Sequence, residues 1–533
     1  MRKLMAWSLA LAAVSSLTLW AADWPSTGGN PQRDGWSQGE TIFSKTSVAK
    51  VKQLWKYKVE NKGTGAGALT NPIVLSRLIG YHGFEELVLT TGTGGSAYAV
   101  DADLGRIYFT TPFNASASAA GTALCPAGQT APMVMFGQSQ TSRFGGFGGA
   151  NPIQRLAAYY SISADGMVHT MRAQDGQDKM IPAAKFLPAG SNVTGLNFAG
   201  DSLYAATING CGGPNGLYAG KFTPPKLPPT PDLPMVEPSK WEVTSFMTNG
   251  AGFAGTAGVA SDTKNDMFFG TIPSGKGDVA GTYSDTVVGL DKSLTVKDWF
   301  TPSQAAPALN AKLPQQGITP AVFAADGKDY VLAGDRMGRI YVLDSTALGG
   351  SDHHTPLFAS DPLIAAPKEG DGTGLYGTFA TMVEGGQRWV FAAVRGPISM
   401  KFAGANGAAE TGGIVAFKLN MTNGKPTLVP AWTSRGLMAP AAPITANGLV
   451  FALSSGMPTA IGKGSTPYTA SEIEKMSKPA TFYILDAETG KEMFTSGTGA
   501  TSYSPSALAV ANGHAYFTTH DNMMYAYGVP EEF

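Results

Sequence analysis

Residues 333–344, AGDRMGRIYVLD, contain a strand-and-turn pattern that recurs along the chain. In its second half, IYVLD, alternate side chains point to opposite faces of a strand, and Asp344 can begin a turn by accepting a backbone hydrogen bond. The same plan of strand, Asp-led turn and second strand recurs in GSAYAVDADLGRIYF (95–109), DTVVGLDKSLTVKDWF (285–300) and ATFYILDAETGKEMF (480–494). An internal repeat of this kind predicts a fold built from copies of one small sheet.

The chain contains eight copies of a four-stranded unit. They lie around 69–111, 131–180, 193–247, 257–301, 318–360, 378–434, 441–497 and 505–528. The eighth copy has only three strands, and VKQLWKYKV (51–59) can supply the fourth. Pairing of the two ends closes the ring and leaves no open edge. The sequence therefore predicts an all-β fold, a single eight-bladed β-propeller in residues 23–533 that is closed by its terminal strands.

The composition suits a chain of many short strands and turns. Of 533 residues, 67 are Gly and 35 are Pro, and only 14% are charged, which leaves little room for long helices. One short surface helix is expected in the insertion at 465–479, with Thr469 or Ser471 as its N-cap. The net charge of −1 does not favour binding of nucleic acid or of an anionic membrane surface.

The first residues have the pattern of a secretory signal peptide. Arg2 and Lys3 precede an apolar run from Leu4 to about Leu19, and small residues follow. The run is short for a membrane anchor and is interrupted by Ser, and no other stretch is long and apolar enough to span a bilayer. We therefore expect residues 1–22 to be removed and the protein to be periplasmic or secreted.

The chain has two cysteines, Cys125 and Cys211. In an oxidising compartment they can form a disulfide that closes a loop of roughly 87 residues, worth on the order of 4 kcal/mol in the chain-entropy account. The alternative is two separate buried thiols. No C-x-x-C-H motif for haem attachment occurs.

The repeats resemble those of bacterial quinoprotein alcohol dehydrogenases, whose eight-bladed propellers bind pyrroloquinoline quinone (PQQ). The similarity lies in DWPSTGGN (23–30) and VAKVKQLWKYKV (48–59), and in the order of motifs from NDMFFGT to AGDRMGRIYVLD (265–344). The chain looks most similar to secreted PQQ-repeat proteins of unassigned function. For an enzyme of this family, the resemblance implies Ca²⁺ beside the quinone, a catalytic aspartate, an aromatic ring and a vicinal disulfide on the cofactor faces, and a basic side chain on the quinone oxygens.

Most of this set is missing at the matching positions. Ile-Pro (272–273) stands where the family has an amide ligand, and TPSQAAPALNAKLPQQ (301–316) has no acid where the catalytic aspartate is expected. No two cysteines are adjacent. Arg336 matches the family's basic cofactor-binding residue, and Phe253 in AGFAGTAG is the nearest counterpart of the stacking tryptophan. The alternative for Arg336 is a turn residue paired with Asp335 or another acid.

Other residues are weaker candidates for ligand binding. Arg395, near the end of RWVFAAVRGP (388–397), can reach the propeller axis and bind an anion, or it can form a salt bridge at the end of its blade. No metal site is predicted, because the adjacent histidines of Asp-His-His (352–354) should point apart in a turn. No G-x-S-x-G or H-E-x-x-H motif of a hydrolase or metalloprotease occurs.

Two functions therefore stay open. The first is an exported binding platform that lacks the usual Ca²⁺–PQQ site and takes a small anion, a saccharide or another envelope protein. The second is a PQQ-dependent oxidoreductase, similar to an alcohol or sugar dehydrogenase, that uses Arg336 in an altered site and passes electrons to a separate cytochrome. In that case Ca²⁺ would bind only with PQQ, and the acids that could reach the axis are Asp278, Asp335 and Asp371. The missing acid, amide, disulfide and tryptophan favour the first function.

Overall fold

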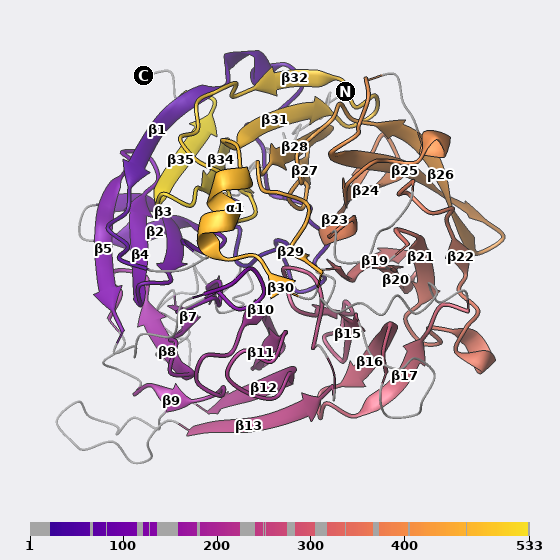
Figure 1. The fold of residues 1–533 in the computed structure, drawn as a ribbon, viewed down its shortest axis with the longest axis horizontal. Coiled ribbons are helices and arrows are strands. Elements are labelled where there is room, and N and C mark those ends of the chain that lie inside the picture. Colours follow the sequence, from indigo (N-terminus) through magenta and orange to yellow (C-terminus); the bar gives the residue numbers. More distant parts are fainter. Residues whose placement is uncertain are drawn as a thin grey trace, which may run out of the picture.

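The computed structural model is a ring of eight antiparallel sheets around a central axis, which confirms the predicted eight-bladed propeller (Figure 1). It describes residues 22–63, 68–80, 83–113, 121–126, 128–135, 158–177, 182–223, 240–248, 250, 252–273, 283–303, 317–335, 337–365, 372–402, 406–464 and 466–530. The predicted signal peptide, except for Ala22, lies outside these ranges. Within them, no helix combines the length and apolar character needed to cross a membrane.

In each of the first seven blades, the strands follow one another from the axis outward (Figure 1). The first four blades comprise β2 (Ile73–Gly80), β3 (Gly83–Gly92), β4 (Ser96–Asp101) and β5 (Arg106–Pro112); β6 (Val134–Met135), β7 (Ala158–Ile162), β8 (Met167–Arg172) and β9 (Ala184–Lys185); β10 (Val193–Ala199), β11 (Ser202–Thr207), β12 (Gly216–Thr223) and β13 (Lys240–Met247); and β14 (Ala260–Ser261), β15 (Met267–Ile272), β16 (Thr286–Asp291) and β17 (Val296–Phe300).

The remaining blades follow the same order, except that the last one takes its outer strand from the start of the chain. They comprise β19 (Ala321–Ala325), β20 (Lys328–Gly334), β21 (Ile340–Asp344) and β22 (Phe358–Ala359); β23 (Gly374–Glu384), β24 (Gln387–Arg395), β25 (Gly412–Thr422) and β26 (Lys425–Thr433); β27 (Ile444–Ala446), β28 (Leu449–Ser454), β31 (Thr481–Asp486) and β32 (Glu492–Thr495); and β33 (Ala509–Ala511), β34 (His514–Thr518), β35 (Met523–Gly528) and β1 (Lys52–Lys58). The repeated motif that ends in Asp forms the third strand of its blade in β4, β16, β21 and β31.

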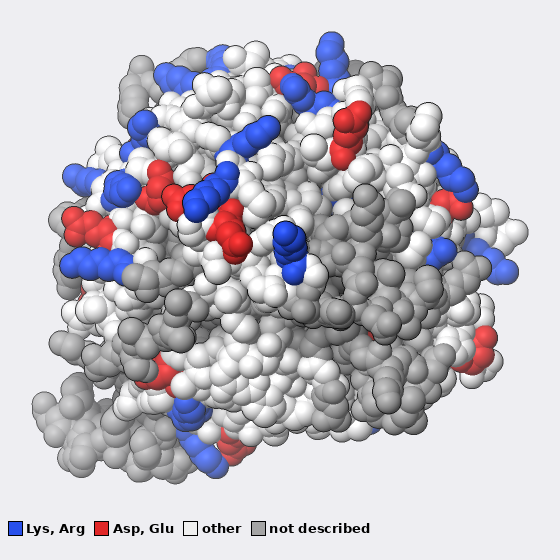
Figure 2. Space-filling model, viewed as in Figure 1, with Lys and Arg blue, Asp and Glu red and all other residues white. Residues whose placement is uncertain are grey.

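A few elements lie outside this plan. The short strand β18 (Ile318–Thr319) pairs in parallel with β23 and so links blades 5 and 6. The hairpin β29 (Gly462–Lys463) and β30 (Thr466–Pro467) and the helix α1 (Ala470–Met476) are inserted between β28 and β31 of blade 7. On the face shown in Figure 2, Lys and Arg are interspersed with Asp and Glu, and the described residues form no large area of one sign.

The predicted closure of the ring is confirmed by the pairing of β1 with β35. Trp55 lies opposite Ala526 in this antiparallel pair. The Trp55 indole also donates a hydrogen bond to the carbonyl of Ala102 in blade 1. Its ring covers Gly105, where an added Cβ would lie 2.5 Å from the indole. One strand therefore completes blade 8 and packs against blade 1.

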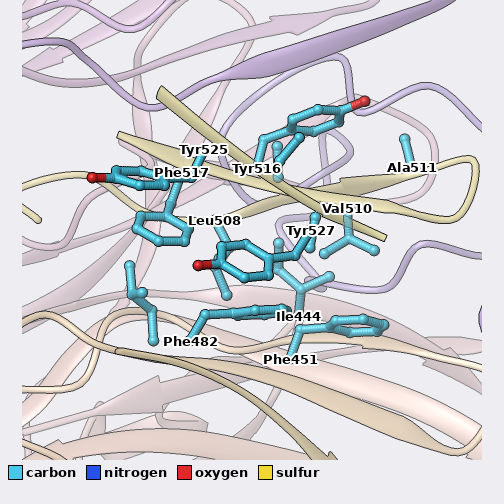
Figure 3. Packing of buried hydrophobic residues seen from close by; sticks show 14 of the residues in the cluster. Ile444, Phe451, Phe482, Leu508, Val510, Ala511, Tyr516, Phe517, Tyr525 and Tyr527 are labelled. Atoms are coloured by element: carbon cyan, nitrogen blue, oxygen red, sulfur yellow. The ribbon is translucent and has the colours of Figure 1, made fainter. Parts of the chain in front are cut away.

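The blades are held together by buried apolar side chains between their faces. Between blades 7 and 8 the rings of Phe482, Phe517 and Tyr527 meet, with centroids 5.6–6.4 Å apart (Figure 3). Each of these rings is at most 2% exposed. Rings of this size contribute the largest apolar areas to a core, so such contacts account for much of the stability of the ring.

Residues 24–37, the N-terminal plug, form at least one hydrogen bond with the innermost strand of every blade. From blade 1 to blade 8 the bonds are Trp24 N–H to Val74 O, Met135 N–H to Pro25 O, Asn197 Nδ2 to Pro31 O, Ser261 N–H to Pro31 O, Val322 N–H to Gln32 O, Thr381 N–H to Asp34 O, Thr445 N–H to Gly35 O and Ser37 Oγ to Val510 O. The plug therefore lies across the axis and ties the eight inner strands together.

Arg33 anchors the plug from a completely buried position. Its guanidinium donates to Ser26 Oγ and Thr27 O, both at 2.7 Å, within the plug. It also donates to Leu196 O of blade 3 and to Val259 O next to blade 4. Burial lowers the pKa of Arg33 to about 9. The charge is tolerated because oxygen acceptors surround it.

Replacement of Arg33 should destabilise the ring strongly. In Arg33→Met the carbonyl and hydroxyl acceptors lose their donor while they stay buried, so we expect the free energy of unfolding to fall by at least about 3 kcal/mol. Urea denaturation followed by tryptophan fluorescence measures the change. The control is Arg106→Met, whose side chain is 71% exposed in a surface ion pair and should change stability by less than about 0.5 kcal/mol. Equal losses in the two variants would contradict the anchoring role.

Asp34 of the plug makes stability depend on pH. Burial raises the pKa of Asp34 to about 6, although Asn30 Nδ2 and the Trp36 N–H donate to its carboxyl group. The folded protein therefore holds this proton more tightly than the unfolded chain. Its contribution is fully present below about pH 4 and is lost as the pH rises through 6.

We expect Asp34→Asn to remove this pH dependence. From pH 5 to 7.5 the wild-type protein should lose about 1.4 kcal/mol of unfolding free energy relative to the variant, which keeps an oxygen acceptor but cannot ionise. Denaturation profiles recorded at several pH values give the difference. Parallel profiles for the two proteins would show that Asp34 does not titrate in this range.

Candidate functional site

A cavity of about 250 Å³ lies at the centre of the ring. In blade 3 the cavity is lined by Val193, whereas Asn197, further along the same strand, contacts the plug. In blade 7, likewise, Ala442 lines the cavity and Thr445 contacts the plug. The inner strands thus run from the cavity towards the plug, which makes the plug the floor of the cavity.

The walls of the cavity are rich in amide and hydroxyl groups set among small apolar side chains. The amide side chains are Asn71, Gln129, Asn192 and Asn209, and the hydroxyls belong to Thr70, Thr93, Thr130, Thr194, Thr256, Tyr376, Ser455, Ser504 and Ser506. Arg395 is the one charged side chain among the lining residues that the structure describes, and none of these is Asp or Glu. The described wall is therefore polar but almost uncharged.

Two inserted segments cover the cavity on the side opposite the plug. One is the segment 121–132 between blades 1 and 2, and the other contains α1, which lies in front of the centre of the ring in Figure 1. The segments join where the Ala123 N–H donates to Tyr468 O at 2.9 Å. Ile473 of α1 lines the cavity and packs with Tyr503.

The helix α1 confirms the predicted cap. Thr469 is its N-cap, and its side chain accepts a hydrogen bond from the backbone N–H of Glu472. The Glu472 side chain accepts one from the Thr469 N–H in return, which completes a capping box.

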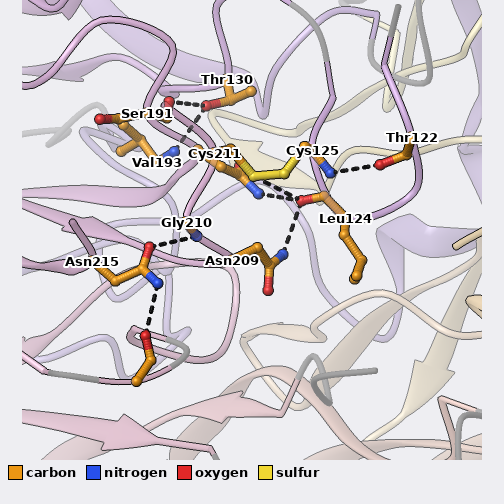
Figure 4. Close-up of a disulfide and its surroundings, with 12 residues drawn as sticks. Thr122, Leu124, Cys125, Thr130, Ser191, Val193, Asn209, Gly210, Cys211 and Asn215 are labelled. Carbon is orange, nitrogen blue, oxygen red and sulfur yellow. Dashed lines mark hydrogen bonds between the residues drawn. A yellow bond between two sulfur atoms is a disulfide. The ribbon is translucent and has the colours of Figure 1, made fainter. Parts of the chain in front are cut away.

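A disulfide between Cys125 and Cys211 fixes the segment 121–132 to blade 3, as predicted (Figure 4). No free cysteine is left. Next to the disulfide, Leu124 O accepts hydrogen bonds from Asn209 Nδ2 at 2.8 Å and from Asn192 Nδ2 at 2.9 Å. Because Leu124 lines the cavity, the disulfide holds part of the cavity wall in place.

Arg395, for which the sequence left both the axis and a salt bridge at the blade end open, lines the cavity. It is only 3% exposed, and its guanidinium lies over the Tyr376 ring, 3.1 Å from the ring centroid. Its Nε donates to Pro440 O at 3.3 Å, and burial lowers its pKa. A stacked guanidinium of this kind is held by a cation–π interaction. Binding of an anion by Arg395 stays a prediction.

Phe253 and Asp335, two of the residues proposed for a quinone site, do not line the central cavity. Phe253 is completely buried between blades 3 and 4, against Phe246 and the backbone of Gly270, so no face of its ring is open to a cofactor. Asp335 accepts hydrogen bonds from the Tyr341 hydroxyl at 2.6 Å and from Arg339, beside a smaller cavity of about 50 Å³. The other candidates, Arg336, Asp278 and Asp371, lie outside the described residues.

The adjacent histidines bind different partners within the protein. His353 Nδ1 lies 3.0 Å from Asp298 Oδ1, and its ring stacks on Trp299 with centroids 3.6 Å apart. His354 Nδ1 lies 2.7 Å from Thr301 O. Over the described part of the chain, no three His, Cys, Asp or Glu side chains are grouped to hold a metal ion.

Solved structures of other proteins share the fold of this chain over nearly its whole length. The quinohaemoprotein alcohol dehydrogenase ADHIIG of Pseudomonas putida HK5 matches with a TM-score of 0.57 and 12% identity over 96% of this chain and 81% of that one. The chain has the fold of the quinoprotein alcohol dehydrogenases. The corresponding enzyme of Comamonas testosteroni matches with a TM-score of 0.53, 13% identity and the same coverage. A europium-containing methanol dehydrogenase matches with a TM-score of 0.52 and 12% identity over 95% of this chain and 89% of that one.

The likeness is confined to the fold. No protein-family model and no curated protein matches the sequence. At identities of 12–13% the positions that carry the chemistry cannot be transferred by fold alone. Function must therefore be inferred from the residues of the cavity.

The described wall does not fit Ca²⁺ with PQQ. Ca²⁺ is bound by several oxygen ligands that usually include carboxylates, and the described wall offers none. Ile272, at the position that matches the family's amide ligand, is a completely buried core residue. Since a cavity of about 150 Å³ takes up benzene, a volume of 250 Å³ suits on the order of ten heavy atoms, fewer than PQQ contains.

Loss of the disulfide should loosen this side of the cavity. The cysteines are 86 residues apart, so the double variant Cys125→Ala/Cys211→Ala should lose about 4 kcal/mol of unfolding free energy, measured by urea denaturation. Reductant should bring the wild-type midpoint down to that of the variant and leave the variant unchanged. If the variant and oxidised wild-type midpoints coincide, the disulfide does not stabilise the folded state.

Proposed function

We propose that this protein is an exported binding protein whose central cavity takes a small molecule, and that it lacks the Ca²⁺–PQQ dehydrogenase site. The observation that carries this proposal is the chemistry of the described wall, where amides and hydroxyls stand without a carboxylate. Such a wall can orient a ligand by hydrogen bonds, but it offers no group to take a proton from an alcohol during oxidation.

The frame of the cavity supports binding to a preformed site. The plug ties the inner strands together below the cavity, and the disulfide holds Leu124 at its edge. A rigid site loses little conformational entropy on binding, so a few hydrogen bonds give useful affinity. A ligand would reach the cavity past the segment 121–132 or past α1.

Export is part of the proposal. The N-terminal basic and apolar pattern is that of a signal peptide, and a structural disulfide is typical of an oxidising compartment. A periplasmic or extracellular protein of this kind would meet small molecules, or another envelope protein, outside the cytoplasm.

The alternative is a PQQ-dependent oxidoreductase with an altered site. It is favoured by the fold shared with the quinohaemoprotein alcohol dehydrogenases and by Arg336, which matches the family's basic residue. It requires a carboxylate such as Asp278 or Asp371 at the axis and a separate cytochrome as electron acceptor. The described wall supplies no acid, and Arg395 is stacked on its aromatic ring, that of Tyr376.

Reconstitution with PQQ distinguishes the two functions. We expect purified protein incubated with PQQ and Ca²⁺ to show no heat of quinone binding, no bound-quinone absorbance and no dye-linked oxidation of alcohols or sugars. The apo form of a known quinoprotein dehydrogenase, treated in the same way, is the positive control. Bound quinone with substrate turnover would overturn the binding-protein proposal.

A further inference from the structure

We infer that the cavity recognises a neutral, polyhydroxylated molecule of about monosaccharide size through Gln129, Asn209 and Thr256. This inference rests on the proposed function, because it names the class of ligand that the central cavity takes. The three residues come from the segment 121–132, from the loop after β11 and from the approach to β14, and all of them line the cavity.

The polar atoms left over in the cavity wall point to a ligand. Gln129 Oε1, Asn209 Oδ1 and Thr256 Oγ1 are buried and have no hydrogen-bond partner in the described part of the chain. Gln129 is only 1% exposed. Buried polar groups in folded proteins are nearly always paired, since an unpaired one costs free energy. Three such atoms around one cavity are explained if a bound molecule pairs with them.

The two amides are oriented so that their oxygens stay available. Gln129 Nε2 donates to Ser161 Oγ at 2.9 Å, and Asn209 Nδ2 donates to Leu124 O at 2.8 Å. By contrast, the Asn71 amide is used on both sides, because it donates to Thr27 and accepts from the Ala507 N–H. The buried atoms that this leaves without a partner are two fixed carbonyl acceptors and one hydroxyl, which can donate or accept.

These groups select for hydroxyl donors over charged molecules. An ionised carboxylate has no proton to give to the amide oxygens, and their partial negative charge disfavours it. An ammonium could donate, but it would be buried in the same cavity as the positive Arg395, whose ring partner and Pro440 already engage it. Neutral hydroxyls satisfy all three atoms without a buried charge.

The size and the apolar part of the wall agree with this class. The volume suits on the order of ten heavy atoms, close to the size of one sugar ring with its hydroxyls. Leu124, Ile461, Ile473 and Pro505 supply apolar contacts in the same cavity. A pyranose has C–H faces for such contacts and hydroxyls at its edge for the amides.

Three probes that share the galactose ring but are neutral, negative or positive test whether the ligand is neutral. Binding of D-galactose, D-galacturonate and D-galactosamine is measured by isothermal titration calorimetry and by saturation-transfer NMR, and D-glucose is a second neutral probe. We expect at least one neutral sugar to bind, and galacturonate and galactosamine to bind at least tenfold more weakly. If a charged probe binds as well as the neutral sugars or better, the inference fails but the binding function stands. If none of the probes binds, the inference fails, and so does the proposal that this cavity binds a small molecule.

Matched variants test the site. Thr256→Val and Gln129→Met should each weaken sugar binding at least tenfold. Thr256→Val removes one polar atom, and Gln129→Met removes Oε1 together with the Nε2 that donates to Ser161, both with little change in shape. Thr256→Ser keeps the hydroxyl and should bind like the wild type. The control is Thr170→Val in β8, which also removes a buried hydroxyl without a partner but lies away from the cavity.

The thermal midpoint of each variant shows whether it is folded, and Gln129→Met keeps the test valid if Thr256→Val does not fold. If Thr256→Val and Gln129→Met are folded and bind sugar like the wild type, the sugar lies elsewhere and the assignment to this cavity is wrong. A loss of binding in Thr170→Val equal to that in Thr256→Val would also overturn it.

Discussion

The antiparallel pairing of β1 with β35 closes the ring and thereby fixes the positions of all eight blades. It gives blade 8 its fourth strand and brings Trp55 onto blade 1. An open arc of eight sheets could splay at its free edges, whereas a closed ring fixes the distance of every inner strand from the axis. The plug can contact all eight blades, and a cavity can persist above it, only because that distance is fixed.

The close approach of neighbouring blades near the axis also explains why glycine is needed there. At Gly377, where φ is +80°, an added Cβ would lie 2.8 Å from Ala442 of the next blade. Gly195 and Gly255 face the backbones of Ala257 and Thr319 even more closely. Backbones of neighbouring blades approach each other where the ring is narrowest, and a side chain there would force them apart. The axis therefore keeps a cavity without wide gaps between the blades.

The cavity has a buried charge in its floor and unpaired polar atoms in its wall, and each of these costs folding free energy. Its floor holds the buried charge of Arg33, which the carbonyls of two blades satisfy, and its wall keeps Gln129, Asn209 and Thr256 with unpaired polar atoms. A loosely packed protein would relax to pair such atoms or expose them to water. The closed ring and the disulfide prevent this relaxation, so the polar atoms stay in position for a ligand. Rigidity and binding chemistry therefore have the same structural origin.

From the repeats alone, the number of blades and the closing strand could be predicted. The sequence also limited the helix cap to Thr469 or Ser471 and left a Cys125–Cys211 disulfide as one of two alternatives. Strand alternation, Asp-led turns and capping can be recognised in a sequence because they depend on residues a few positions apart or on a repeat. Only the tertiary structure decided that the plug crosses the axis, that Arg33 is buried in it, and that Phe253 belongs to the core instead of the cavity. It also brought Gln129 and Thr256 to one wall. No spacing rule connects such residues, since the closure of the whole ring sets the distances between them.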